Sequence, residues 1–139
     1  MPPRDSKLAG VLEAYFRETP VPLSCAYLFG SYARGEVTAS SDIDVAVLFP
    51  AGPPARDAHG ALLGPATSVR GDLERLLGRT VDLVDLRRAP VDLIHRVLRD
   101  GQLLVERDPR ERVRFEVEKR NEYFDLLPFL KRYRRGQAA

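Results

Sequence analysis

The segment spanning residues 30–49 constrains the fold of this chain more than any other part of the sequence. It starts with Gly30-Ser31 and continues, after ten further residues, with an Asp-x-Asp triplet made by Asp42 and Asp44. The residues that follow are rich in Val, Ile and Phe, so 42–49 is predicted to be a buried β-strand. Because side chains alternate across a strand, the two carboxylates project from one face while Ile43 points into the core on the other. The segment therefore predicts a sheet that is apolar on one face and carries paired acids on the other.

The rest of the chain alternates between helical and extended patterns. Apolar residues recur at three-to-four spacing in the helical segments, and short Val/Leu-rich runs end at Gly or Pro in the extended ones. We expect helices at 6–18, 65–77, 90–100 and 108 to about 134, strands at 25–29, 42–49 and 81–86, and a minor strand at 103–105. This order predicts an α+β fold, in which helices cover a small mixed β-sheet.

The composition narrows the class of protein. The chain has 139 residues, with 22 Lys and Arg against 20 Asp and Glu, a net charge of +2. That length fits one domain, which we divide into a core at 1–107 and a helical extension at 108–139. The near-neutral charge does not indicate direct nucleic-acid binding, and neither a signal peptide nor a membrane-spanning run is found. One cysteine, Cys25, excludes an intrachain disulfide, and we expect a cytoplasmic protein that makes no membrane contact.

A third carboxylate is expected beside the first two. The strand predicted at 81–86 offers Asp82 and Asp85, which are three residues apart and so cannot share a face of a regular strand. Asp82 lies between two apolar residues within the strand, whereas Asp85 lies at its end, so we assign Asp82 to the site. Neighbouring carboxylates repel each other unless a cation lies between them, and Mg²⁺ prefers such hard oxygen ligands. We therefore predict a magnesium site at Asp42, Asp44 and Asp82.

The turn before the paired acids is expected to receive phosphate. Gly30 allows close approach to the backbone, and the Ser31 hydroxyl can donate a hydrogen bond. Arg34 is a further candidate for the phosphates. The spacing of Gly30 and Gly35 imitates a P-loop, but Glu36 follows where a P-loop requires Lys, so a P-loop NTPase is excluded.

The C-terminal helix has a clear start and an unusual composition. Asp108 at the N-cap, Pro109 at N1 and Glu111 at N3 form a capping-box pattern, and Pro128 predicts a kink or break near 124–128. Two apolar stripes run along it, and one is enough to pack on the domain. A second stripe indicates a protein contact, with itself or with a partner. The stripes are Val113, Val117, Phe124 and Leu127, and Phe115, Tyr123, Leu126, Leu130 and Tyr133.

These motifs resemble the minimal nucleotidyltransferases (MNT type) of the polymerase-β-like superfamily. The resemblance rests on 29–34, 41–48 and 81–86, and less specifically on 122–128. It implies the polymerase-β-like fold and a transferase that uses ATP as substrate and two Mg²⁺ ions as cofactors. Asp42 and Asp44 would hold both ions and Asp82 one of them, with Gly30, Ser31 and Arg34 at the nucleotide.

The same resemblance extends to the antitoxins of HEPN–MNT toxin–antitoxin pairs. It implies a partner, a HEPN-domain ribonuclease toxin, and transfer of AMP to a tyrosine hydroxyl of that toxin. Two alternatives stay open. One is an antitoxin that blocks its toxin by binding alone, and the other is a small-molecule (antibiotic) nucleotidyltransferase, although such enzymes usually carry a further substrate-binding domain. The complete set of acids favours an active enzyme.

Overall fold

The computed structural model describes residues 6–34, 42–51 and 64–137 of the chain. Helices and strands lie close to the segments expected from the sequence, and two elements differ. A short helix follows the first strand where a turn was expected, and the minor strand has five residues. In chain order the elements are α1 (Ser6–Glu18), β1 (Cys25–Phe29), α2 (Ser31–Arg34), β2 (Ile43–Leu48), α3 (Pro65–Leu77), β3 (Val81–Asp85), α4 (Val91–Asp100), β4 (Gln102–Glu106) and α5 (Pro109–Gln137).

The four strands form one mixed sheet in the order β3-β2-β1-β4. β1 is antiparallel to both β2 and β4, whereas β2 and β3 are parallel. Parallel neighbours require a crossover, and α3 lies in the connection between them. The predicted α+β fold with a small mixed sheet is therefore confirmed.

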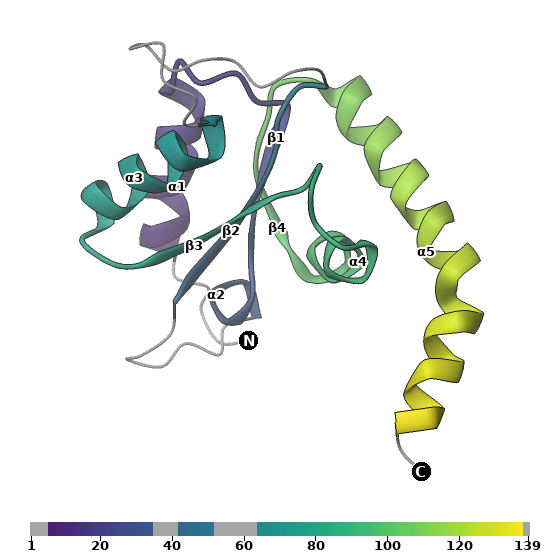
Figure 1. Ribbon diagram of the computed structural model, residues 1–139. Helices are drawn as coiled ribbons and strands as arrows, with labels where there is room; N and C mark the ends of the chain where they lie inside the picture. Colours follow the sequence, from purple (N-terminus) through teal and green to yellow (C-terminus); the bar gives the residue numbers. More distant parts are fainter. Residues whose placement is uncertain (1–5, 35–41, 52–63, 138–139) are drawn as a thin grey trace.

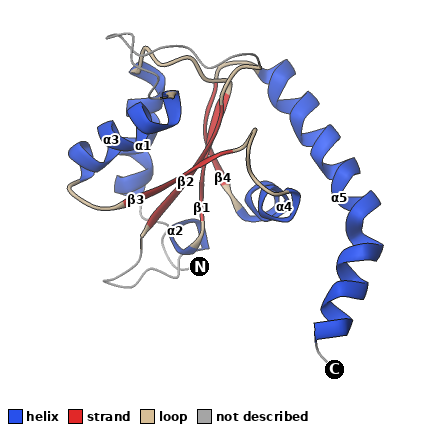
Figure 2. Cartoon of the chain, viewed as in Figure 1, coloured by secondary structure: helices blue, strands red, loops and turns tan. Residues whose placement is uncertain are grey.

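Helices cover both faces of this sheet. Figures 1 and 2 show α1 and α3 on one side and α4 and α5 on the other. Alternate residues of the strands supply two cores. Ile43, Val45 and Val47 of β2 pack with α1 and α3, and Ala46 and Leu48 pack in the cluster on the α4 side. This alternation also decides which face of the sheet carries the acids.

The helix α5 differs from the expectation at Pro128. A kink or break was predicted near 124–128; the helix does not break but runs continuously from Pro109 to Gln137 with Pro128 inside it, and it bends along its length (Figure 1). Proline removes the hydrogen bond to the carbonyl of Phe124 and disfavours a straight helix. Both residues are exposed, so water can reach that carbonyl and the helix bends instead of ending.

The helices α3 and α4 end at the residues that the sequence predicts. Gly78 ends α3 with a left-handed φ of 63°, and Gly101 follows α4. At the start of α5 only half of the capping box forms. The Glu111 N–H donates to the Asp108 carboxylate at 3.1 Å, but the Asp108 N–H donates to the carbonyl of Ser24.

None of the helices in the described ranges is long and apolar enough to span a bilayer.

Candidate active site

The register of the sheet places two of the predicted acids side by side. Asp44 of β2 lies opposite Asp82 of the parallel strand β3, and opposite Phe29 of β1 on its other side. Neighbouring residues in register share a face of the sheet, and strands lie about 4.8 Å apart. The two carboxylates therefore stand next to each other on the face covered by α4. Asp42 lies exposed immediately before β2.

Asp85 lies on the opposite face, as strand parity predicts. It is in register with Val47, which belongs to the core under α1 and α3. Its carboxylate accepts a hydrogen bond from the Arg87 N–H at 3.0 Å and lies 4.0 Å from Arg88. Asp85 thus stabilises the turn after β3, and it does not face Asp44.

Gly30 and Asp44 are packed against each other. Gly30 has a φ of +72°, the left-handed region that favours glycine. A Cβ built at this position would lie 2.1 Å from the Asp44 carboxylate oxygen, which is far inside van der Waals contact. The missing side chain therefore makes the space that the Asp44 carboxylate occupies. This gives Gly30 a role that the sequence did not reveal, because the sequence predicted only approach of a phosphate.

These residues open into a hollow of about 370 Å³. Its wall on one side comes from the end of β1 and the start of α2, with Asp44 on β2. The other wall is α4, which brings apolar and charged side chains that the sequence gave no reason to place here. The lining residues are Phe29, Gly30, Ser31, Asp44, Leu93, Arg96, Arg99 and Asp100.

Two arginines of α4 therefore face the same hollow as the acid of β2. α4 is fixed by Ile94 and Val97, which are buried against the sheet, so Arg96 stands on a rigid support. Arg96 is exposed and forms no ion pair within the described ranges. Arg99 lies in a double contact with Asp100, with N–O distances of 2.9 and 2.8 Å. The hollow thus carries Asp44 on the sheet wall and two guanidinium groups on the α4 wall, which suits a metal-bound polyphosphate.

A sequence signal for these arginines exists but is weak. In the heptapeptide Ile94–Asp100 the buried residues Ile94 and Val97 alternate with Arg96 and Arg99 in a helical pattern. That pattern identifies the outer face of the helix, but it does not show which part of the protein that face contacts. The face lies near Asp44 only because β3 and α4 carry the chain back across the sheet.

The thiol and the phenol buried below the site are not reactive groups. Burial raises the pKa of the Cys25 thiol to about 11, so the thiol stays neutral and acts as a small apolar residue, as expected from the sequence. Burial also raises the pKa of Tyr27 well above its usual value, and the Tyr27 hydroxyl donates to Glu116 of α5 at 2.6 Å. Tyr27 thereby ties α5 to the sheet.

His95 of α4 and Tyr123 of α5 are in contact. His95 is half-buried and its ring stacks on Tyr123 with centroids 3.7 Å apart. These residues are brought together only by the packing of α4 on α5. The side chain of Arg34 lies outside the described residues, so its predicted role at the phosphates stays a prediction.

The carboxylates have the chemistry of a magnesium site. Within the described residues no three His, Cys, Asp or Glu side chains converge closely enough to form a metal cluster. The donors themselves fit, since all are carboxylate oxygens and Asp44 and Asp82 are neighbours in register.

Comparison with known proteins identifies the family. The family model described as "Polymerase beta, Nucleotidyltransferase" matches residues 12–110, which include Asp42, Asp44 and Asp82. The chain belongs to this family. It is therefore a nucleotidyltransferase, and the fold predicted from the motifs is that of polymerase-β-like nucleotidyltransferases. A search of curated proteins finds no match.

Several of the similar solved structures are toxin–antitoxin complexes. A chain of a toxin–antitoxin complex with AMP-PNP matches with a TM-score of 0.73 and 28% identity, over 94% of this chain and 98% of that one. A complex of a tri-AMPylated HEPN toxin with its MNT antitoxin from Shewanella oneidensis matches with a TM-score of 0.67 and 26% identity, over 94% and 99%. This nucleotidyltransferase is thus similar over nearly its whole length to MNT antitoxins of HEPN toxin pairs.

Proposed function

We propose that this nucleotidyltransferase is an antitoxin that transfers AMP from ATP to a tyrosine hydroxyl of a HEPN-domain toxin, with magnesium at its acids. The observation that carries the proposal is the register of Asp44 with Asp82, together with a hollow in which Asp44 meets Gly30, Ser31 and Arg96. The AMP-PNP bound complex and the tri-AMPylated toxin, both from similar proteins, support the nucleotide and the acceptor.

Asp42, Asp44 and Asp82 would hold the magnesium ions. When bound, such ions neutralise phosphate charge and lower the pKa of an attacking hydroxyl. The carboxylates stand on a rigid sheet, and the Asp44 carboxylate occupies the space left by the missing side chain of Gly30. Asp82 is exposed at the start of β3, where it can accept the proton of the acceptor hydroxyl.

The hollow then orients the triphosphate. The Ser31 hydroxyl and the guanidinium of Arg96 stand on different walls, and we assign them to phosphate oxygens, with Arg96 toward the β- and γ-phosphates. In the reaction the acceptor oxygen bonds to the α-phosphorus, the α–β phosphoanhydride bond breaks and pyrophosphate leaves. Positioning and charge neutralisation supply most of the catalysis in such a site.

The experiment is transfer of label from α-³²P-ATP to the purified HEPN-domain partner in Mg²⁺. The wild-type chain should label the partner, and Asp42→Asn/Asp44→Asn should label it at least 100-fold more slowly while keeping its melting temperature. Neutralisation of toxin ribonuclease activity is measured beside it. A double variant that neutralises the toxin as well as the wild type would show that the antitoxin acts by binding alone.

A further inference from the structure

The face of α5 that packs on the domain combines aromatic and charged side chains. Phe115 is buried under the sheet, and Tyr123 stacks on His95 of α4. Between them Glu116 accepts the hydrogen bond from Tyr27, and Lys119 lies over the Phe115 ring at 5.8 Å. Residues at this three-to-four spacing lie on one side of a helix, so 115, 116, 119 and 123 define the side of α5 that faces the domain.

The same side is apolar after the domain ends. Counting on from Tyr123 at the same spacing gives Leu126, Leu130 and Tyr133, and Phe129 lies beside them. The exposed fractions of Leu126, Phe129 and Tyr133 are 37%, 61% and 65%. Figure 1 shows this part of α5 extending beyond α4, and none of the other described helices and strands covers it. We call these four residues the distal face.

The positive charge around the distal face indicates which kind of partner can bind there. Residues 126–137 carry Lys131, Arg132, Arg134 and Arg135 and no acidic residue. A second copy that used the same patch would form a two-fold interface, in which four positive charges meet four positive charges. A partner with an apolar surface edged by acidic residues has complementary charge and can also be attracted over longer distances.

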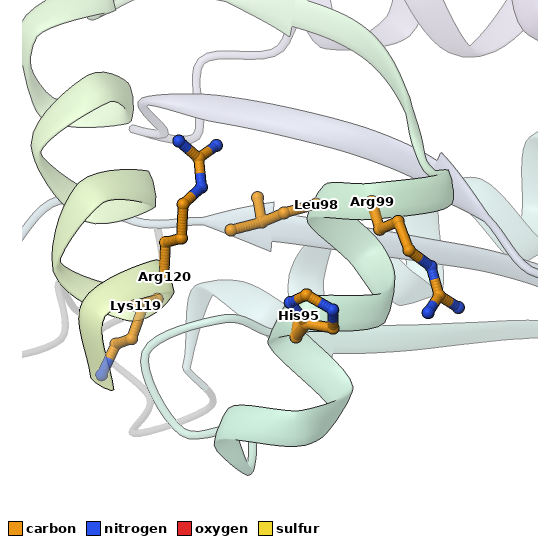
Figure 3. Close-up of a pocket in the computed structure, with 5 residues that line it drawn as sticks. All are labelled: His95, Leu98, Arg99, Lys119 and Arg120. Carbon is orange, nitrogen blue, oxygen red and sulfur yellow. The ribbon is translucent and has the colours of Figure 1, made fainter. Parts of the chain in front are cut away.

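The position of the distal face connects it with the active site. The residues at the junction of α4 and α5 enclose a second hollow of about 220 Å³, lined by His95, Leu98, Arg99, Lys119 and Arg120. Arg99 lines this hollow and also the catalytic one. In Figure 3 Leu98 points toward α5, whereas the guanidinium of Arg99 points away from it. A protein that lies along α5 therefore reaches the rim of the catalytic hollow.

We propose that the distal face of α5 is the docking surface for the protein that accepts AMP, an acidic partner whose apolar surface covers Leu126, Phe129, Leu130 and Tyr133. The proposal rests on the proposed function, because it names where the acceptor binds. It explains why α5 is longer than its packing on α4 requires. The hydroxyl that is modified would lie near the end of the docked surface, next to Arg99.

The test compares a double variant on the distal face with a control variant on α3, on the other side of the sheet. Leu130→Asp/Tyr133→Asp places acids on the distal face, while Leu76→Asp places one on an exposed residue of α3, which has an exposed fraction of 54%. Both sites are on the surface, so melting temperatures should match the wild type within a few degrees. The measurements are affinity for the HEPN-domain protein, KM and kcat for AMP transfer, ATP affinity, and mass of the free chain by light scattering.

We expect the distal variant to bind the acceptor at least tenfold more weakly and to raise the KM for it, with kcat and ATP affinity unchanged. The control variant should behave as the wild type. The proposal is wrong if the distal variant binds normally, if the control loses binding equally, or if the free wild-type chain forms a dimer that the distal variant dissociates. If the wild-type chain labels the acceptor and both variants bind the acceptor as tightly as the wild type, the proposed function stands and only the docking surface is rejected. A wild type that neither binds nor labels it rejects both.

Discussion

The contact between Gly30 and Asp44 allows the geometry of the site to be perturbed without touching any charge. In Gly30→Ala a new methyl group would lie 2.1 Å from the Asp44 carboxylate oxygen, whereas real Cβ contacts essentially never fall below 3.0 Å and ordinary ones lie at 3.4–4 Å. The carboxylate must therefore move by about 1 Å, and a displacement of that size in a catalytic group can reduce a rate about 100-fold. We expect AMP transfer to fall by that factor.

The same substitution also has a backbone effect, which a control can remove. Gly30 has a φ of +72°, and alanine in that region costs about 1–2 kcal/mol of folding free energy. Gly78 at the end of α3 has a φ of 63°, and a Cβ there would meet no atom within 4 Å. Gly78→Ala therefore carries the same backbone cost without a contact to the site. Both variants should lose about 2–5 °C of melting temperature per kcal/mol, as expected for a chain of 139 residues.

The assay is the initial rate of α-³²P label transfer at a temperature where both variants are fully folded. Gly78→Ala should retain the wild-type rate within about twofold, whereas Gly30→Ala should lose it about 100-fold. Equal rates in the two alanine variants would refute the argument, because they would show that the Asp44 carboxylate has room to move without consequence. A far larger loss of stability in Gly30→Ala would show that the contact supports the fold more than the site.

Two further predictions concern the third acid and the α4 wall of the hollow. Asp82→Asn should abolish label transfer, whereas Asp85→Asn should retain most of it, since Asp85 faces the opposite core. The reverse result would mean that Asp85 supplies the third carboxylate. Arg96→Ala should weaken ATP binding about tenfold in calorimetry and leave AMP binding unchanged, because a charged hydrogen bond to the outer phosphates contributes about 1.5–3 kcal/mol. Arg114→Ala on α5 is the matched control. If Arg96→Ala weakens ATP and AMP binding equally, Arg96 does not contact the outer phosphates.

The strands and the acids were predictable because they depend on local rules. Alternation along β2 separates Asp44 from Ile43, and parity along β3 separates Asp82 from Asp85, whatever the rest of the chain does. The predicted faces agree with the register of the sheet. The ends of α3 and α4 at glycines and the start of α5 at Asp108 are local in the same sense, since each depends on the geometry of a few neighbouring residues.

The second wall of the active site was decided only by the tertiary structure. Arg96 and Arg99 are ordinary surface arginines in the sequence, and they enter the site because Ile94 and Val97 bind α4 to the same face of the sheet that carries Asp44. Nothing local encodes that juxtaposition, because it depends on the strand order and on where the chain crosses the sheet.

The roles of the two stripes of α5 were decided in the same way. Periodicity shows that both stripes exist, but it cannot show which one the domain covers. The structure buries Phe115 and leaves Val113, Val117 and Phe124 exposed. Packing is a property of two surfaces, so the sequence of one helix can specify its apolar sides but not the partner that each side meets. For the same reason the stacking of Tyr123 on His95 was visible only after α4 and α5 had been placed together.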